Sequence, residues 1–179
     1  MLHTEHCCLV VIDIQGKLAQ LMHQKEALFK SLSILIQGAK ILHIPVLWCQ
    51  QVPDTLGPTV DCVRELLTDE TPINKSSFSC WPNDQFQQRF AAINPSQAIL
   101  CGIETHICVW QTACDLHRQG IHTEVVVDAV SSRTLENKNL ALEKMRQVGI
   151  GLTGVEMALF ELLGTADHTS FRQTAKLIK

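Results

Sequence analysis

Short apolar runs and longer amphipathic segments alternate along the whole chain. Residues 7–14 read CCLVVIDI, a nearly continuous apolar run typical of a strand buried on both faces of a parallel sheet. Shorter runs predict further strands, and the segments between them carry apolar residues at helical spacing. The expected strands are 7–14, 45–50, 73–78, 96–103, 123–130 and 149–152, and the expected helices are 17–42, 60–67, 84–93, 105–119 and 135–148, with one more that begins at a Thr153-x-x-Glu156 capping box.

This alternation predicts an α/β fold, with a parallel sheet covered by helices on both faces. No internal repeat, low-complexity tract or linker-like stretch interrupts it, so we expect a single domain over residues 1–179. Ligands of open parallel sheets bind beyond the carboxyl ends of the strands, near the point where the strand order reverses. The polar residues that end strands are therefore the first candidates for a functional site.

Amino-acid composition and charge argue against several classes of protein, including nucleic-acid-binding and membrane proteins. Charged residues make up 18% of the 179 residues, below the roughly 25% of an average soluble chain, which suggests an extensive core or a subunit interface. The net charge is −3 and no basic run occurs, so we expect no nucleic-acid partner. No apolar run approaches the roughly 20 residues of a membrane span, and the first residues do not resemble a secretion signal. We expect a cytoplasmic protein without a membrane partner.

Eight cysteines invite a disulfide or zinc interpretation. In the reducing cytoplasm thiols stay free, and the Cys-x-x-Cys pairs of structural zinc sites are missing. Most of the cysteines are expected to be small buried apolar residues. Cys108 differs, because it falls in the first turn of a predicted helix, where free N–H groups and the helix dipole can lower a thiol pKa and hold an oxyanion.

Two further strand ends carry chemistry. Asp13, followed by Gln15, ends the first apolar run, and a buried carboxylate is costly unless it is paired. Lys75 lies in the polar stretch NKSSF of the third predicted strand, 73–78. Each has an ordinary alternative: Asp13 can cap a helix or form a loop salt bridge, Lys75 can be solvated, and Cys108 can be a packing residue.

Three motifs in this order resemble those of the isochorismatase-like cysteine hydrolases, a superfamily that includes nicotinamidases and N-carbamoylsarcosine amidohydrolases. They are D-x-Q at 13–15, K-x-x-F at 75–78 and GIETHICV at 102–109. The resemblance covers most of the chain. It implies a Rossmann-like α-β-α sandwich whose six-stranded, mostly parallel sheet has the order 3-2-1-4-5-6.

The same resemblance implies site residues. It places a catalytic triad at Asp13, Lys75 and Cys108, a cis peptide bond between Ile103 and Glu104, and an oxyanion hole at the N–H groups of Glu104 and Cys108. Gln15, Phe78, Trp81 and His106 lie near these motifs and are candidates for the substrate pocket, with plain packing as the alternative.

Two differences from known members of this superfamily disfavour particular substrates. Nicotinamidases carry a metal-binding Asp-x-His after the second strand, whereas residues 48–54 here read WCQQVPD. We therefore predict no metal and no cofactor, and nicotinamide is a disfavoured substrate. True isochorismatases lack the nucleophilic cysteine that this chain keeps, which disfavours hydrolysis of a vinyl ether.

The sequence thus predicts hydrolysis of a small amide, or of a related C–N acyl bond, through a covalent thioester. The alternatives are a non-catalytic oligomeric binding or scaffold protein and a thiol redox sensor. The family forms oligomers, and Phe171, Ala175 and Ile178 give the last helix an apolar stripe that can face another subunit. We expect a dimer or tetramer.

Overall fold

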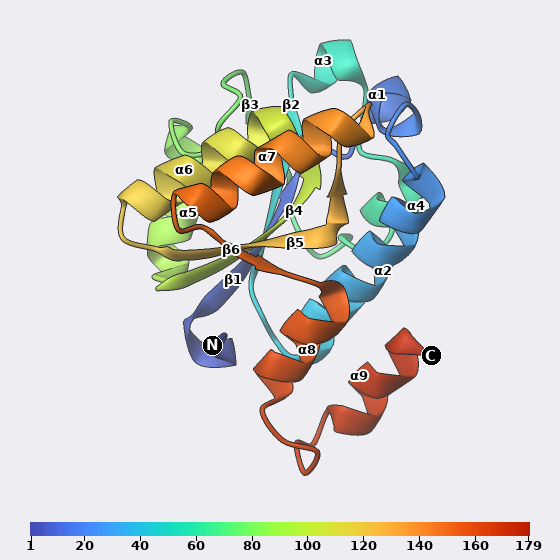
Figure 1. The fold of residues 1–179 in the computed structure, drawn as a ribbon, viewed down its shortest axis with the longest axis vertical. Helices are drawn as coiled ribbons and strands as arrows, with labels where there is room; N and C mark the ends of the chain where they lie inside the picture. Colours follow the sequence, from blue (N-terminus) through green and yellow to red (C-terminus); the bar gives the residue numbers. More distant parts are fainter.

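The computed structural model describes residues 1–179 and has a six-stranded sheet at its centre (Figure 1). All strand pairs are parallel, and their order is β3-β2-β1-β4-β5-β6. The predicted α/β class and the predicted order are therefore confirmed. The strands are β1 (Cys7–Ile12), β2 (Val46–Gln51), β3 (Ile73–Lys75), β4 (Gln97–Ile103), β5 (His122–Ser131) and β6 (Gly151–Thr153).

Helices cover both faces of the sheet (Figure 1). The longer ones are α2 (Lys25–Ile41), α5 (Asp84–Ile93), α6 (Trp110–Arg118), α7 (Leu135–Gln147), α8 (Val155–Leu163) and α9 (Phe171–Ile178). The shorter ones are η1 (Thr4–His6), α1 (Gly16–Gln20), α3 (Pro53–Leu56), α4 (Asp61–Arg64) and η2 (Thr105–Val109), the last of which is a π-helical turn.

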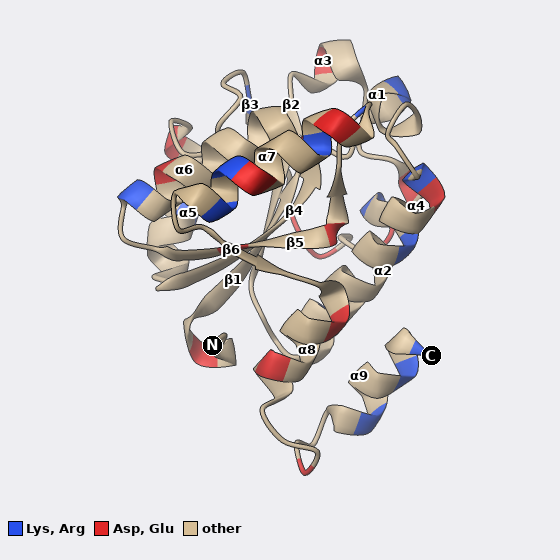
Figure 2. Cartoon of the chain, in the orientation of Figure 1, with Lys and Arg blue, Asp and Glu red and all other residues tan.

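The pleat of β1 explains why a continuous apolar run is needed. Cys7, Leu9 and Val11 point into the core beneath α2 and α8, whereas alternate residues such as Cys8 and Val10 point into the core beneath α5, α6 and α7. Both faces of the strand are thus buried. Most charged residues lie on the outer helices, and the central strands contain few (Figure 2).

The order of the strands reverses at β1. The chain builds β1, β2 and β3 outward in one direction, then returns to place β4 on the other side of β1. The carboxyl ends of β1 and β4 therefore lie side by side, with Ile12 opposite Gly102. A crevice for ligands is expected at this point of a parallel sheet.

The predicted helix 17–42 is wrong as one element. It divides into α1 and α2, and Gln24 between them has a left-handed φ of 51°. Contacts with the end of β5 hold the break: the His23 N–H donates to the Ser132 carbonyl at 2.9 Å, and the Ser131 hydroxyl donates to the His23 carbonyl at 2.8 Å.

The predicted capping box at Thr153 is also wrong. Thr153 belongs to β6, and the side chain that accepts from the first N–H of α8 is Asp128, at 2.9 Å from Val155 N. Asp128 on β5 therefore caps the start of α8 in place of Thr153.

The apolar stripe of the last helix packs on its own chain. Phe171 and Ile178 of α9 contact the core beneath α2 and α8, and the Phe171 ring lies edge-on to Phe160 with centroids 6.2 Å apart. The stripe therefore has packing partners in its own molecule but stays partly exposed, and its contact with another subunit stays a prediction.

Candidate active site

Asp13 lies directly after β1, at the reversal of the strand order. The strand ends at Ile12, and Asp13 has a left-handed φ of 54°, with its N–H donating to the Cys49 carbonyl at 3.1 Å. The residue is 2% exposed. Its Oδ2 accepts from Lys75 Nζ at 2.7 Å, whereas its Oδ1 has no hydrogen-bond partner. One carboxylate oxygen is thus held, and the other remains available.

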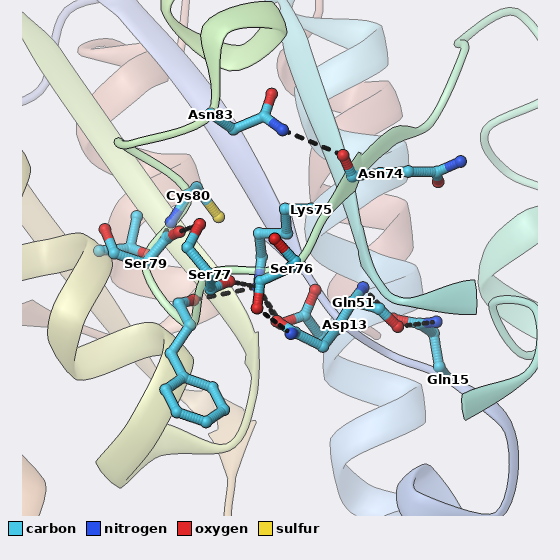
Figure 3. A network of polar contacts seen from close by, with 12 residues as sticks. Asp13, Gln15, Gln51, Asn74, Lys75, Ser76, Ser77, Ser79, Cys80 and Asn83 are labelled. Carbon is cyan, nitrogen blue, oxygen red and sulfur yellow. Dashed lines mark hydrogen bonds and ion pairs between the residues drawn. The ribbon is translucent and has the colours of Figure 1, made fainter. Parts of the chain in front are cut away.

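Lys75 ends β3 and is fully buried against the carboxylate (Figure 3). Its ammonium also donates to Gln51 Oε1 at 2.6 Å and to the carbonyls of Ser77 and Phe78 at 3.1 and 3.0 Å. Burial lowers the pKa of Lys75, but the charge of Asp13, the nearby Cys80 and Cys108 thiols and the hydrogen bond to Asp13 together outweigh burial, and the net shift is upward. The charged ammonium is therefore the favoured form beside Asp13.

Gln15 supports this pair through Gln51 (Figure 3). The Gln51 N–H donates to Gln15 Oε1 at 2.6 Å, and Gln15 Nε2 donates to the Gln51 carbonyl at 3.1 Å and to the Gly57 carbonyl at 2.8 Å. The Gln51 side chain in turn donates to the Ser76 carbonyl at 2.8 Å while accepting from Lys75. Two buried amides thus fix the position of the ammonium.

The carboxyl end of β4 approaches β1 closely. Gly102 has a φ of 123°, and a Cβ atom there would lie 2.1 Å from the Ile12 carbonyl oxygen, so only glycine fits. One residue further on, the peptide bond between Ile103 and Glu104 is cis. The chain then enters η2, which brings Cys108 to the same edge of the sheet as Asp13.

Cys108 is 7% exposed and faces Asp13. Asp13 and Cys108 line the same cavity, and Asp13 Oδ1 has no hydrogen-bond partner. Burial raises the pKa of the Cys108 thiol, the charge of Asp13 raises it further, and Lys75 opposes both. The predicted lowering of the thiol pKa is wrong, because burial outweighs the influence of the helix terminus.

Burial also raises the pKa of the Asp13 carboxyl, against the lowering influence of Lys75. A carboxylate with a raised pKa is a stronger base than an ordinary one. The resting arrangement is therefore a neutral thiol beside a buried carboxylate with a free oxygen.

A small cavity of about 110 Å³ opens on these groups. It contains the thiol and the carboxylate on one side and aliphatic and aromatic side chains on the others. Its lining residues are Asp13, Leu18, Gln51, Leu56, Phe78, Ile103, Glu104, Ile107 and Cys108. A larger hollow of about 510 Å³, between residues 1–6 and 161–164, includes none of them.

Of the four predicted pocket residues, the cavity includes Phe78 only. Gln15 is buried behind Gln51 and makes the hydrogen bonds described above. Trp81 packs edge-on against the rings of Phe86 and Phe90. His106 Nδ1 lies 2.9 Å from Ser132 Oγ.

Sequence reasoning missed four lining residues. Gln51 ends a strand at the same edge as Asp13, so the strand-end argument could have found it. Ile107 adjoins Cys108 in the third motif. Leu18 and Leu56 belong to the short helices α1 and α3, and no local signal marks them.

Glu104 contributes two different groups to the site. Its N–H has no hydrogen-bond acceptor, and the residue borders the cavity. Its carboxylate Oε1 accepts from both the N–H and the Nε of Arg133, each at 3.1 Å. The side chain is thus engaged, whereas the N–H remains free for a ligand.

No group of three or more histidine, cysteine, aspartate or glutamate side chains lies close enough together to share a metal ion. The absence of a metal from the working protein stays a prediction. No helix has both the length and the apolar character that crossing a membrane would require.

The fold and the site define an α/β protein with a buried Asp–Lys pair next to a cysteine at the reversal of strand order. The family model of the isochorismatase domain matches residues 7–157, and the chain belongs to this family.

The chain is similar to three known proteins. The secreted isochorismatase effector Isc1 of Phytophthora sojae is 37% identical over 177 residues, which cover 96% of this chain and 83% of the relative. The structure of the MAR1 ribonuclease from Caenorhabditis elegans has a TM-score of 0.93 and 36% identity, covering 99% of this chain and 91% of that one. The YcaC gene product of Escherichia coli, an octameric hydrolase of unknown specificity, has a TM-score of 0.93 and 22% identity, with 99% and 88% covered.

Proposed function

We propose that this protein is a cysteine amidohydrolase that cleaves a small amide, or a related C–N acyl bond, through a thioester on Cys108. The observation that carries the proposal is the free Oδ1 of a buried Asp13, whose other oxygen is held by Lys75. Asp13 and Cys108 line the same cavity, so this oxygen is available to take the thiol proton. Membership of a hydrolase family agrees with it.

In the first half-reaction, Cys108 Sγ attacks the amide carbonyl while Asp13 takes the thiol proton. The carbonyl oxygen becomes an oxyanion, which the N–H groups of Glu104 and Cys108 stabilise by about 3 kcal/mol per donor. Asp13 then gives the proton to the leaving nitrogen, the C–N bond breaks, and the amine departs. Lys75 keeps the carboxylate ionised and in position between these transfers.

In the second half-reaction, water attacks the thioester carbonyl. Asp13 takes a proton from this water, the same N–H groups hold the second oxyanion, and the C–S bond breaks. The proton returns to the Cys108 sulfur, the carboxylic acid leaves, and the enzyme is regenerated.

The nematode structure is described as a ribonuclease, but the cavity here does not favour RNA. RNA binding depends on cationic groups that meet phosphates, and no lysine or arginine lines the cavity. We propose that the substrate is a small molecule.

Location and assembly remain proposals. The Phytophthora sojae relative is secreted, so a cytoplasmic location rests on the sequence alone. An oligomer is favoured by the octameric Escherichia coli protein.

The test combines turnover with trapping. Purified protein is incubated with a panel of small primary amides, ammonia release is measured, and acid-quenched samples are examined by intact mass spectrometry. We expect ammonia release with an acyl adduct on the Cys108 peptide, and neither in Cys108→Ala. Ammonia release that persists in Cys108→Ala contradicts the mechanism. No turnover of any amide favours a binding protein, and reversible peroxide oxidation of Cys108 without turnover favours a redox sensor.

A further inference from the structure

The polar groups around the cavity are almost all engaged within the protein. Gln51 accepts from Lys75 and donates to Ser76, and the Glu104 carboxylate is held by Arg133. The groups left for a ligand are the Asp13 Oδ1, the Cys108 thiol and the N–H groups of Glu104 and Cys108, all of which the proposed reaction itself uses at the amide group. No polar side chain is left to recognise the rest of a substrate.

The charges at the cavity are balanced as well. Asp13 is neutralised by Lys75 at 2.7 Å, and Glu104 is paired with Arg133 at 3.1 Å. A charged substituent of the substrate would leave water without meeting an opposite, unpaired charge. Burying such a group is strongly unfavourable.

The remaining walls are apolar and leave little room. Leu18, Leu56, Phe78, Ile103 and Ile107 surround the reactive groups, and the cavity holds about 110 Å³. A water molecule occupies about 30 Å³ in the liquid, so this volume corresponds to roughly four water-sized groups.

We propose that the site selects amides whose acyl group is uncharged, aliphatic and small, with about three to five carbon atoms. This inference rests on the proposed amidohydrolase function and names its substrate class. The acyl chain packs against Leu18, Leu56 and Ile107, while the amide group meets Asp13, Cys108 and the Glu104 N–H. Phe78, which is 54% exposed, forms the outer rim.

The first experiment does not depend on turnover. Iodoacetamide and iodoacetate have nearly the same shape and differ in charge, and both alkylate a thiol by displacing iodide. Their rates at Cys108 are measured by mass spectrometry of its peptide and divided by their rates at the exposed Cys62. We expect a normalised preference of at least about 30-fold for the neutral reagent. Equal normalised rates overturn the proposal.

The second experiment uses substrates of matched shape. Acetamide, propionamide, butyramide and hexanamide form a neutral series, and β-alaninamide is the cationic counterpart of butyramide. We expect kcat/KM to rise about fourfold per methylene up to butyramide, as burial of a CH₂ group predicts, and to fall at hexanamide. β-Alaninamide is expected to be at least about 100-fold poorer than butyramide.

The two experiments separate the inference from the function on which it rests. Neutral selectivity in alkylation without hydrolysis of any amide retains the substrate class as a binding preference and contradicts the amidohydrolase. Hydrolysis of amides with equal rates for butyramide and β-alaninamide retains the amidohydrolase and overturns the inference.

Two variants extend the test. Leu56 is only partly buried, so Leu56→Lys can place a cation at the wall without a buried charge in the core. It is expected to reduce the preference for iodoacetamide over iodoacetate by at least about tenfold. Leu140→Lys on the exposed face of α7 is the matched control and should leave the preference unchanged. An unchanged preference in folded Leu56→Lys contradicts the placement of the acyl group.

Discussion

Two cysteines on one stretch of chain, Cys101 inside β4 and Cys108 just beyond it, have very different surroundings. Burial raises the pKa of both thiols. Cys101 is fully buried in the sheet, and its Sγ donates only to the Val10 carbonyl, at 3.7 Å. Cys108 has a carboxylate with a free oxygen beside it and a cavity in front of it. The difference between a packing thiol and a candidate nucleophile is therefore the neighbouring base, because the thiol pKa is raised in both.

The largest expected effect comes from removing the thiol itself. Cys108→Ala should lower amide turnover by on the order of 10⁴-fold or more, because no other group can form the acyl-enzyme. Cys101→Ala is the matched control, which should retain turnover within about twofold and lose only about 1 kcal/mol of stability. Ammonia release and urea unfolding measure the two effects. Equal losses of activity in the two variants would show that the position beside Asp13 is not special.

The base is the next group to test. Asp13→Asn keeps the volume of the side chain but removes the proton acceptor, so alkylation of Cys108 and turnover should fall by about 10²- to 10⁴-fold. Asp69→Asn, at an exposed aspartate paired with Lys40, should change neither. If Asp13→Asn folds normally and reacts at the wild-type rate, the free oxygen of Asp13 has no part in activating the thiol.

Lys75 tests the buried ion pair. Lys75→Met leaves the Asp13 charge without its partner in the core, which should cost about 3–5 kcal/mol of unfolding free energy. Arg146→Met breaks an exposed pair with Glu143 and should cost less than about 1 kcal/mol. Urea unfolding of both variants gives the comparison. The double variant Asp13→Asn/Lys75→Met should recover part of the loss, and a further additive loss would contradict the role of the uncompensated charge.

The sequence predicted most of the fold because β1 is buried on both faces and its apolar run is continuous. The break between α1 and α2 could not be predicted, since it is held by Ser131 and Ser132 more than 100 residues further along the chain. Local sequence also cannot show that Asp128 caps α8 from another strand.

At the site, Asp13 and Lys75 could be predicted because both are polar residues at the carboxyl edge of the sheet. The direction of the Cys108 pKa shift could not, since a helix terminus lowers a thiol pKa where the helix end is accessible, and the burial of Cys108 arises from tertiary packing. Leu18 and Leu56 were missed because α1 and α3 reach the cavity only in the folded chain.

Gln15 tests the support of the ammonium through Gln51. Gln15→Ala leaves the buried N–H and carbonyl of Gln51 without their amide partner, which should cost about 1–3 kcal/mol of stability and lower kcat more than it raises KM. Gln37→Ala is the control, because Gln37 donates only to Ser33 in its own helix and should change stability by less than about 1 kcal/mol. If Gln15→Ala and Gln37→Ala have the same effects on urea unfolding and on the kinetics, Gln15 does not position the ammonium.

The pH dependence of alkylation distinguishes a base-assisted thiol from an ordinary one. This is the smallest of the expected effects, a difference in alkylation rate of about tenfold per pH unit. The rate at exposed Cys62 should rise tenfold per unit towards its thiol pKa, because its thiolate fraction does. The rate at Cys108 should stay flat through neutral pH, since the thiol pKa is raised and the ionised Asp13 carboxylate is available to take the thiol proton during attack.

Below neutral pH, the alkylation rate of Cys108 should fall tenfold per pH unit as Asp13 is protonated. This fall should occur at a pH above the ordinary carboxyl pKa near 3.9, because burial raises the pKa of Asp13.

The raised pKa of Asp13 also makes the free energy of unfolding depend on pH, and here acid favours the folded state. The folded state binds this proton more tightly than the unfolded state, so the contribution of protonated Asp13 is fully present below the unfolded pKa and is lost as the pH rises through the folded one. Alkylation rates and urea unfolding over one pH series measure both. If the alkylation rate of Cys108 rises with pH as steeply as that of Cys62, Cys108 is an ordinary thiol without a neighbouring base.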